Sequence, residues 1–520
     1  MKYSQFATII LLLLIACAPT PAPAPQAAGV TGVVTATPQV VIVTPTPEPI
    51  HTPTVTQTST IEPTSTPTRT PSLTRTPLPP VAVSFYRLRI DYSTTSDWAI
   101  LELKNLDRIL TTRLMGVSGR ATLATASAER LHLQQPLEAA RAGQRVGVVM
   151  DYAIAADALN QPLAFLLKRG GLNETNMRVF NVVGSEIQPV QEIRHQGVVQ
   201  SDPNLNPLEF SLDLNLLKNT PPRQAQIQRV PKMLWAFYYV WYSYADWSKP
   251  LLKDHPTTLY SSDEPSTVAR HIEQAQRAGI DGFIVSWFGS GYTDRNLKLL
   301  LDLAEDRNFY VAIYLETLKD DGSPRDVDTL YRWLAYAIST YRDHPAFMKV
   351  NGKPVIAIWS SESVPLTDWK NIFAKLRQQG LDATYLAKQY NTTNLQVFDG
   401  LHEYGVVEIP NLAQTAAAVG RDTRYYPLLA DSAASKIWAA TIQPGYDERL
   451  IPGRRGVFKE RDNGAFYRST FEAALNSNPD WVFITSWNEW WENTHIEPSQ
   501  LYGNQYLQVT REFADKWKGK

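Results

Sequence analysis

Residues 265–316 read PSTVARHIEQAQRAGIDGFIVSWFGSGYTDRNLKLLLDLAEDRNFYVAIYLE, and this stretch decides the fold class. Its apolar residues follow a helical period twice, and each helical segment leads into a short apolar run that is typical of a buried strand. Gly279 closes the first helical segment, as glycine commonly does at a helix end. The stretch therefore predicts helix, strand, helix and strand at 265–278, 280–288, 294–307 and 310–316.

The same alternation continues on both sides of this stretch, from residue 230 to residue 520. We expect further strands at 233–242, 354–359, 383–389, 397–401, 437–442 and 481–487, and further helices at 327–342, 368–379, 466–477 and 503–517. Roughly eight strands alternating with helices favour a (β/α)8 TIM barrel, an α/β fold, over a doubly wound sheet. No glycine-rich phosphate-binding turn opens any of these helices, which argues against the nucleotide-binding folds.

A β-rich region, residues 81–225, precedes the barrel. Its apolar and polar residues alternate in short runs between turn signals, and we expect strands at 83–90, 99–103, 146–152, 163–167, 178–183 and 210–214. Strands at this spacing predict an all-β, sandwich-like accessory domain. Trp98 is the one tryptophan of this region, and two interpretations stay open: a carbohydrate-binding module or a structural spacer.

The first 17 residues have the pattern of an export signal. Lys2 precedes an apolar run at 6–15 that is interrupted only by Thr8 and is shorter than the roughly 20 residues that a membrane-spanning helix needs. Leu14-Ile15-Ala16-Cys17 resembles a bacterial lipobox, in which the cysteine is lipidated and becomes the new N-terminus. We therefore expect an exported protein with Cys17 as its lipid anchor; the alternative is an ordinary signal peptide that contains a cysteine.

Residues 18–80 form a Thr/Pro-rich linker. They hold 15 of the 36 prolines and 17 threonines, a composition that sustains neither a helix nor a sheet ladder. Proline-rich chain favours the extended polyproline II conformation and acts as a semi-rigid spacer. The sequence thus predicts a stalk that holds the folded head away from the membrane, in the cell envelope and outside the cytoplasm.

Composition narrows the class of protein. The 520 residues include 50 Lys+Arg and 51 Asp+Glu, and a net charge of -1 gives no support to a nucleic-acid binder. The single cysteine excludes a disulfide scaffold and a thiolate metal cluster. The eight histidines form no i,i+4 pair and no HExxH motif, which argues against a zinc hydrolase. We therefore expect no metal and no organic cofactor.

Aromatic residues and acids gather at the predicted carboxyl ends of the barrel strands, where TIM barrels carry their catalytic groups. Candidate substrate contacts at these ends are Tyr239, Tyr242, Trp287, Glu316, Tyr404, Tyr446 and Asp447. Aromatic faces stack on sugar rings, and breaking a glycosidic bond needs two carboxyl groups. Glu489 and Glu492 follow the last predicted strand and can face one pocket if the chain turns helically there; the alternative is a pair of solvated loop acids.

Residues 483–498 read FITSWNEWWENTHIEP, which resembles the W-N-E-W-x-E-x-T-x-I-E-P signature of glycoside hydrolase family 99, the endo-α-mannosidases. Further motifs match that family in the same order along the barrel. These are AGIDGFIVSW at 278–287, KPVI at 353–356, FDG at 398–400 with Tyr404, and PGYD at 444–447 with Pro452-Gly453 shortly after. The resemblance covers the barrel region and not residues 1–225.

The resemblance implies a retaining mechanism through a 1,2-anhydro-sugar, with Glu489 and Glu492 as the catalytic pair. Glu489 would assist the substrate's 2-hydroxyl, and Glu492 would be the general acid and then the base. Further candidate contacts in this segment are Trp487, Asn488 and His495, although Trp487 could instead seal the upper core. The family usually has His and Gly where this chain has Trp491 and Asn493, so the sugar accepted beside the cleavage point stays open.

These patterns lead to a main hypothesis and two alternatives. The main one is a membrane-tethered, retaining, endo-acting glycoside hydrolase that cleaves internal α-mannosidic or related α-glycosidic bonds in a polysaccharide or oligosaccharide. The first alternative is a non-catalytic glycan-binding surface lipoprotein. The second is an envelope-polysaccharide biosynthesis enzyme of transferase type.

Overall fold

A computed structural model describes residues 78–104, 108–119, 122–126, 130–160, 162–169, 173–183, 185–197, 208–430 and 434–519. The predicted export signal, the lipidated Cys17 and nearly all of the Thr/Pro-rich linker lie outside these residues. Within the described ranges, no helix combines the length and the apolar character that crossing a membrane requires.

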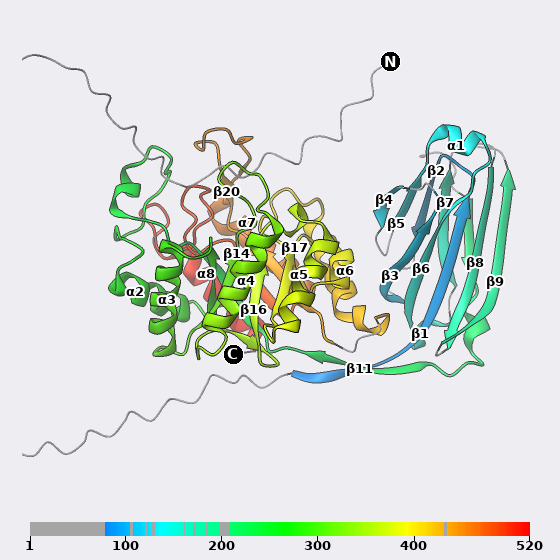
Figure 1. Ribbon diagram of the computed structural model, residues 1–520, viewed down its shortest axis with the longest axis horizontal. Helices are drawn as coiled ribbons and strands as arrows, with labels where there is room; N and C mark the ends of the chain where they lie inside the picture. Colours follow the sequence, from blue (N-terminus) through cyan, green and yellow to red (C-terminus); the bar gives the residue numbers. More distant parts are fainter. Residues whose placement is uncertain are drawn as a thin grey trace, which may run out of the picture. The chain divides into compact units, whose positions relative to one another are not determined.

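The (β/α)8 barrel predicted from the sequence is confirmed (Figure 1). Its parallel strands are β12 (Met233–Tyr238), β13 (Gly282–Trp287), β14 (Tyr310–Leu315), β16 (Lys353–Ile358), β17 (Thr384–Lys388), β18 (Gly400–His402), β19 (Ile437–Ile442) and β22 (Trp481–Ile484). They are hydrogen-bonded in the order β14-β13-β12-β22-β19-β18-β17-β16, and pairing of β14 with β16 closes the ring. Two strands end several residues before their predicted ends: β12 ends at Tyr238 rather than at 242, and β22 ends at Ile484 rather than at 487. The residues beyond these ends belong to the loops that bear the candidate site.

Helices cover the outside of the barrel, as Figure 1 shows. They are α2 (Pro265–Arg277), α3 (Tyr292–Glu305), α4 (Val327–Tyr341), α5 (Leu366–Gln378), α6 (Leu412–Tyr425), α7 (Ala465–Asn476) and α8 (Gln505–Lys518). Every residue of β12, β13, β14, β19 and β22 is buried, because side chains on both faces are covered. Gly279 ends the α2 segment at φ +82°, a left-handed conformation that glycine adopts without strain.

The helix α6 was missed by the sequence analysis. Its buried positions combine the small residues Ala416, Gly420 and Thr423 with the charged residues Asp422 and Arg424, so no row of large apolar side chains marks the helix. A Cβ at Gly420 would come within 2.5 Å of the Trp438 indole, so the close packing of α6 on β19 requires glycine there. Tertiary contact, rather than a strong hydrophobic stripe, therefore identifies this helix.

The accessory domain consists of two antiparallel sheets, as predicted (Figure 1). One sheet contains β3 (Ile109–Ser118), β6 (Val146–Ala155), β1 (Leu78–Thr94), β8 (Asn173–Val183) and β9 (Glu186–Gly197), and the other contains β10 (Leu208–Leu212), β7 (Leu163–Arg169), β2 (Trp98–Leu103), β5 (Arg130–Gln134) and β4 (Thr122–Ala126). Side chains of both sheets, such as Ile90 and Phe165, share one apolar core. The predictions omitted β3, β4, β5, β9 and the connecting strand β11 (Arg223–Arg229), which pairs with the first half of β1.

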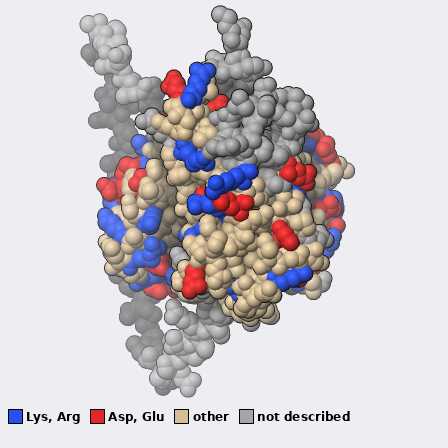
Figure 2. Space-filling view, turned by 90° about the vertical axis from the view of Figure 1, so that its right-hand side faces the viewer, with Lys and Arg blue, Asp and Glu red and all other residues tan. Residues whose placement is uncertain are grey.

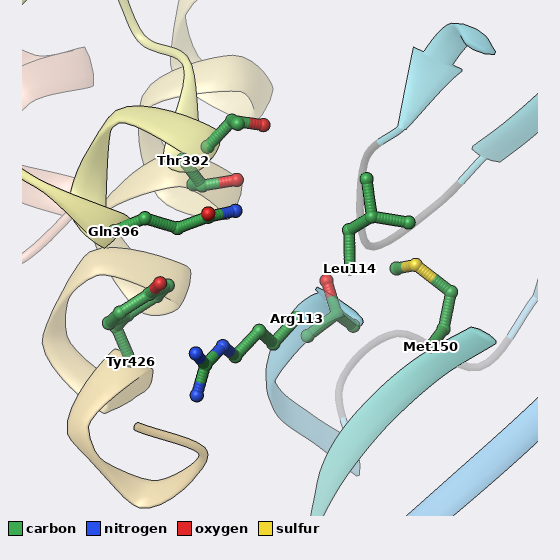
Figure 3. Close-up of a pocket in the computed structure, with 8 residues that line it drawn as sticks. Arg113, Leu114, Met150, Thr392, Gln396 and Tyr426 are labelled. Atoms are coloured by element: carbon green, nitrogen blue, oxygen red, sulfur yellow. The ribbon is translucent and has the colours of Figure 1, made fainter. Parts of the chain in front are cut away.

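The accessory domain and the barrel touch through β3, α6 and the short helix η7 (Tyr426–Leu428). The Thr111 hydroxyl donates to the Asp422 carbonyl at 3.1 Å, and the Arg113 guanidinium donates to the Leu429 carbonyl at 2.7 Å. Figure 3 shows a small cavity of about 20 Å³ at this contact, with Arg113 on one side and Tyr426 on the other. A cavity of this size holds about one water molecule, so it is a packing defect rather than a ligand site.

Charges of both signs are mixed on the exposed strands of the accessory domain. Arg178 on β8 lies between Asp91 on β1 and Glu192 on β9 in the strand register, and it forms an ion pair with Asp91. On the face drawn in Figure 2, blue and red residues are likewise interspersed among uncharged ones. That face therefore offers no single-sign field for a polyanion.

Candidate active site

The loop after β22, residues 485–498, folds back on itself at the carboxyl end of the barrel. The Ser486 amide donates to the Thr494 carbonyl at 2.9 Å, and the Ile496 amide donates to the Ser486 carbonyl at 3.0 Å. The Trp487 amide bonds to the Phe237 carbonyl of β12 at 2.8 Å, which fixes the loop to the barrel. Both predicted catalytic acids lie inside this closed loop.

Asn493 explains one of the two departures from the family signature. Its φ is +51°, in the left-handed region, at the position where the family usually has glycine. Asparagine is the non-glycine residue that enters this region at least cost. The backbone turn after Glu492 is therefore compatible with either glycine or asparagine at this position.

Glu489 is 5% exposed and accepts two hydrogen bonds on one carboxylate oxygen. The donors are the Tyr242 hydroxyl and the Trp491 amide, each at 3.3 Å from Oε1. Burial raises the pKa of Glu489 well above its usual range, and the neighbouring Glu492 raises it further. The acid form of Glu489 therefore persists to higher pH than that of an exposed carboxyl group.

Glu492 is 8% exposed and has a different set of partners. The Tyr404 hydroxyl donates to Oε2 at 3.2 Å, the Tyr446 hydroxyl lies 3.4 Å from Oε1, and the Arg454 guanidinium lies 3.5 Å from Oε1. The Tyr239 hydroxyl donates to the Tyr404 hydroxyl at 2.6 Å and so orients it toward the acid. Burial raises the pKa of Glu492, and the charge of Arg454 opposes that rise.

Glu316 adds a third acid, from the end of β14. The Ser286 hydroxyl donates to its Oε1 at 2.6 Å. Burial raises the pKa of Glu316 to about 7, a shift that this hydrogen bond and the charge of Arg325 partly offset and that Glu492 reinforces. Five of the predicted contact residues thus surround the pair Glu489 and Glu492: Tyr239, Tyr242, Glu316, Tyr404 and Tyr446.

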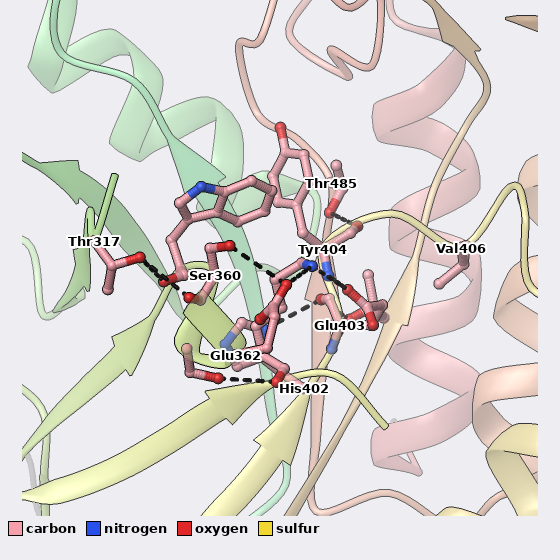
Figure 4. Close-up of polar contacts among 12 residues, drawn as sticks. Thr317, Ser360, Glu362, His402, Glu403, Tyr404, Val406 and Thr485 are labelled. Carbon is pink, nitrogen blue, oxygen red and sulfur yellow. Dashed lines mark hydrogen bonds and ion pairs between the residues drawn. The ribbon is translucent and has the colours of Figure 1, made fainter. Parts of the chain in front are cut away.

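A network of hydrogen bonds and ion pairs holds the backbone of Tyr404 in place (Figure 4). The Thr485 hydroxyl donates to the Tyr404 carbonyl at 2.6 Å, and the Tyr404 amide donates to the Glu403 carboxylate at 3.0 Å. Lys388 lies 3.5 Å from Glu403 and 3.0 Å from Glu362, so one ammonium bridges the ends of neighbouring strands. Tyr404, which donates to Glu492, is therefore held in place by charged groups that no local sequence motif indicated.

Two of the predicted tryptophan contacts lie away from the acids. Trp287 is fully buried, its indole N–H donates to Asp294 at 3.0 Å, and its ring stacks with Tyr336 of α4. Trp487 is also fully buried and belongs to the main core of the barrel. Neighbouring residues of a strand point to opposite sides, so Ser286 rather than Trp287 reaches the site.

Asn488 and Asp447 lie near the acids, but other protein groups already occupy their polar atoms. The Asn488 amide exchanges hydrogen bonds with the Tyr239 backbone at 2.8 and 2.9 Å. The Asp447 carboxylate accepts from Arg449 at 2.7 Å and pairs with Lys253. The structure therefore places both side chains as supports for the loops that carry the site.

The side chain of His495 belongs to a buried framework of the same loop that the sequence did not indicate. Its Nε2 lies 3.2 Å from the Asp254 carboxylate, and its ring stacks on Trp490 with centroids 3.9 Å apart. The Arg461 guanidinium donates to the carbonyls of Asn493 and His495 at 2.8 and 2.9 Å. Asp254 and Arg461 lie in loops beside other charged residues, and nothing in their local sequence distinguishes them.

Trp491 forms a wall beside Glu489, at the second position that departs from the family signature. Its ring stacks with Trp241 with centroids 6.3 Å apart, and the Lys249 ammonium lies 5.2 Å from its ring centre. Its buried indole N–H has no acceptor among the described residues. An aromatic wall with a free donor is suited to a sugar ring and one of its hydroxyls.

The geometry supports proton chemistry on a hydroxyl-rich substrate. Three acids and four tyrosines converge at one end of the barrel, and within the described ranges no group of three or more His, Cys, Asp or Glu side chains is arranged to hold a metal ion. Residues 255–517 match the sequence model of glycosyl hydrolase family 99.

The chain belongs to glycosyl hydrolase family 99.

Known proteins that this family 99 chain resembles cover the same region. A glycoprotein endo-alpha-1,2-mannosidase-like protein of Mus musculus is 26% identical over 365 residues, which are 56% of this chain and 78% of the mouse protein. A glycoprotein endo-alpha-1,2-mannosidase of Rattus norvegicus is 25% identical over 373 residues, 57% of this chain and 78% of the rat protein. A crystallised family 99 endo-alpha-mannosidase of Bacteroides thetaiotaomicron is 24% identical, with a TM-score of 0.49 over 55% of this chain and 97% of that protein. This family 99 protein is a glycoside hydrolase.

Proposed function

We propose that this glycoside hydrolase cleaves internal α-mannosidic bonds with retention of anomeric configuration. The observation that carries the proposal is the buried pair Glu489 and Glu492 at the carboxyl end of the last barrel strand, with separate tyrosine partners for each acid. Two similar animal proteins are named as endo-alpha-1,2-mannosidases or as proteins like them, which supports an α-mannoside as the substrate. The 2-hydroxyl of an α-mannoside is trans to the leaving group and can act as an internal nucleophile.

The first step breaks the glycosidic bond. Glu489, as a carboxylate, takes the proton of the 2-hydroxyl while that oxygen bonds to the anomeric carbon and forms a 1,2-anhydro-sugar. Glu492 gives its proton to the leaving oxygen, so the leaving sugar departs as a neutral alcohol. In the second step Glu492 takes a proton from water, the water oxygen bonds to the anomeric carbon, and Glu489 returns its proton to the 2-oxygen.

The position of the shared proton follows from the electrostatics. Burial raises the pKa of both acids, and the charge of Glu492 raises that of Glu489 further. We propose that the pair therefore shares one proton in the free protein. Arg454 favours the carboxylate at Glu492, which leaves that proton on Glu489. A substrate 2-hydroxyl that donates to Glu489 favours a carboxylate there instead. Substrate binding thereby moves the proton to Glu492, where the first step needs it.

Digestion of labelled glycans tests the proposed reaction. We expect the protein, without any activated sugar donor, to convert reducing-end-labelled α-mannan oligosaccharides into shorter products of internal cleavage, detected by mass spectrometry. Proton NMR at early times should show the α-anomer first. An initial β-anomer would contradict retention, binding without cleavage would favour a glycan-binding protein, and chain extension that requires a sugar donor would favour a transferase. The double variant Glu489→Gln/Glu492→Gln is the control for contaminating activity.

We also propose that Cys17 anchors the protein to a membrane through lipid. Serine cannot form the thioether that lipidation requires, so in a bacterial host Cys17→Ser should move the protein from the membrane fraction to the soluble fraction. Fractionation with immunodetection, together with metabolic labelling by a fatty acid, measures the change. Retention of Cys17→Ser in membranes after a high-salt wash would contradict the anchor.

A further inference from the structure

Arg454 is a buried cation beside a catalytic acid. It lies on the loop between the short strands β20 (Tyr446–Asp447) and β21 (Phe458–Lys459) and follows a turn in which Gly453 has φ +78°. Its side chain is 5% exposed. The guanidinium lies 3.5 Å from Glu492 and 3.3 Å from Glu448, so it spans the two carboxylates.

Glu448 holds the other side of this cation. Its side chain is fully buried, its Oε2 accepts from the Tyr446 hydroxyl at 2.8 Å, and its Oε1 accepts from the Val457 amide at 3.0 Å. The Tyr446 hydroxyl has one proton and lies closer to Glu448 than to Glu492, so it donates its hydrogen bond to Glu448. Glu448 is therefore fixed by the loop itself and lies next to the catalytic acid without a place in the reaction.

The charged and titratable groups around Glu492 come from several elements. They are Tyr239 after β12, Glu316 after β14, Tyr404 after β18, Tyr446 on β20, Glu448 and Arg454 on the following loop, and Glu489 on the loop of Glu492 itself. Arg454 is the cation of this set, and the others are acids or phenols. Burial has the largest effect on the pKa of Glu492 and raises it; among the charges, Arg454 lowers this pKa and Glu448 raises it.

We propose that Arg454 and Glu448 form a tuning pair that sets the proton affinity of Glu492. Arg454 favours the carboxylate of Glu492, which the second step uses to activate water. Glu448 limits this preference, so that Glu492 still takes up the proton that the first step delivers to the leaving oxygen. Arg454 and Glu448 are positioning residues, and the inference rests on the acid–base role proposed for Glu492.

The two members of the tuning pair predict pH effects of opposite sign. Arg454→Met removes a positive charge, so the acid form of Glu492 should persist to higher pH, and the alkaline limb of kcat/KM should move up by about 1 unit or more. Glu448→Gln removes a negative charge and should move the same limb down. Arg454→Lys keeps the charge and should leave the limb within a few tenths of a unit of the parent. The measurement is kcat/KM against pH on a labelled α-mannan oligosaccharide, whose leaving sugar needs the proton.

Several outcomes would overturn the tuning pair. If Arg454→Met lowers kcat at every pH without moving the alkaline limb, the role of Arg454 is merely structural. Equal pH profiles for Arg454→Met and Arg454→Lys would also overturn the proposal, because only lysine keeps the charge. If circular dichroism shows that Arg454→Met does not fold, the Glu448→Gln variant alone tests the proposal. An alkaline limb of kcat/KM that stays in place or moves up in Glu448→Gln would then refute it. The Glu492→Gln variant separates the two levels of inference. Activity retained there defeats the proposed role of Glu492, whereas its loss together with unmoved limbs in the other variants defeats only the tuning pair.

Discussion

Glu489→Gln and Glu492→Gln should each reduce turnover by about 10²–10⁴-fold, the usual value of general acid–base assistance. Glutamine keeps the shape of each side chain and the contacts with Tyr242 and Tyr404, so both variants should fold like the parent. Turnover is measured on α-mannan oligosaccharides, and folding by the thermal unfolding transition. Glu472→Gln, on an exposed position of α7, is the matched control and should retain full activity.

The two losses should differ in kind. An α-mannoside with a good leaving group departs without a proton, so its first step should be partly spared in Glu492→Gln. In Glu489→Gln the 2-hydroxyl is no longer activated, and leaving-group quality should not rescue the rate. Near-parent activity of either variant on any substrate that the parent cleaves would falsify the assignment. A rescue by leaving group in Glu489→Gln alone would exchange the two roles.

Glu316→Gln should make the protein more stable at alkaline pH. Because burial raises the pKa of Glu316 from 4.5 to about 7, the folded protein holds a proton there that the unfolded chain has already lost. The favourable contribution of that proton is complete below pH 4.5 and disappears as the pH rises toward 7. Glutamine cannot ionise, so relative to the parent the variant should gain about 3 kcal/mol of unfolding free energy between pH 4.5 and pH 8.

The difference between variant and parent isolates the effect of Glu316. The raised pKa values of Glu489 and Glu492 also make the stability depend on pH, but their contributions largely cancel when the parent curve is subtracted from the variant curve. Denaturant unfolding at several pH values gives both curves, and Glu472→Gln should give a difference that does not depend on pH. A Glu316→Gln difference that is flat or that falls with rising pH would contradict the raised pKa. A gain in stability combined with lost activity would show that this acid is kept for function.

The barrel was predictable because each of its strands and helices carries its own signal. The segments 265–278 and 280–288 show helical and strand patterns without reference to the rest of the chain, and the structure places α2 and β13 there. The helix α6 has no row of large apolar side chains, because its buried face holds small residues, such as Gly420 against Trp438, and charged ones. The missed strands of the accessory domain, such as β9, are short of apolar residues and depend on pairing with their neighbours.

The location of the two acids was predictable for the same reason. Glu489 and Glu492 lie in one short segment, and their spacing and surrounding residues could be compared with a known signature. The left-handed turn at Asn493 shows how the chain keeps that backbone although it departs from the signature. By itself, the sequence thus determined the barrel, the order of its elements and the loop that bears the pair.

Only the tertiary structure decided what surrounds the pair. Arg454 and Glu448 reach Glu492 from another loop, Trp287 turns away into the helix layer, and His495 pairs with Asp254 behind the loop. Proton affinities depend on burial and on distances through space, and charges from distant parts of the chain contribute as much as sequence neighbours do. Spacing along the chain carries no record of these distances, so the electrostatic setting of the site emerges only when the strands close into a barrel.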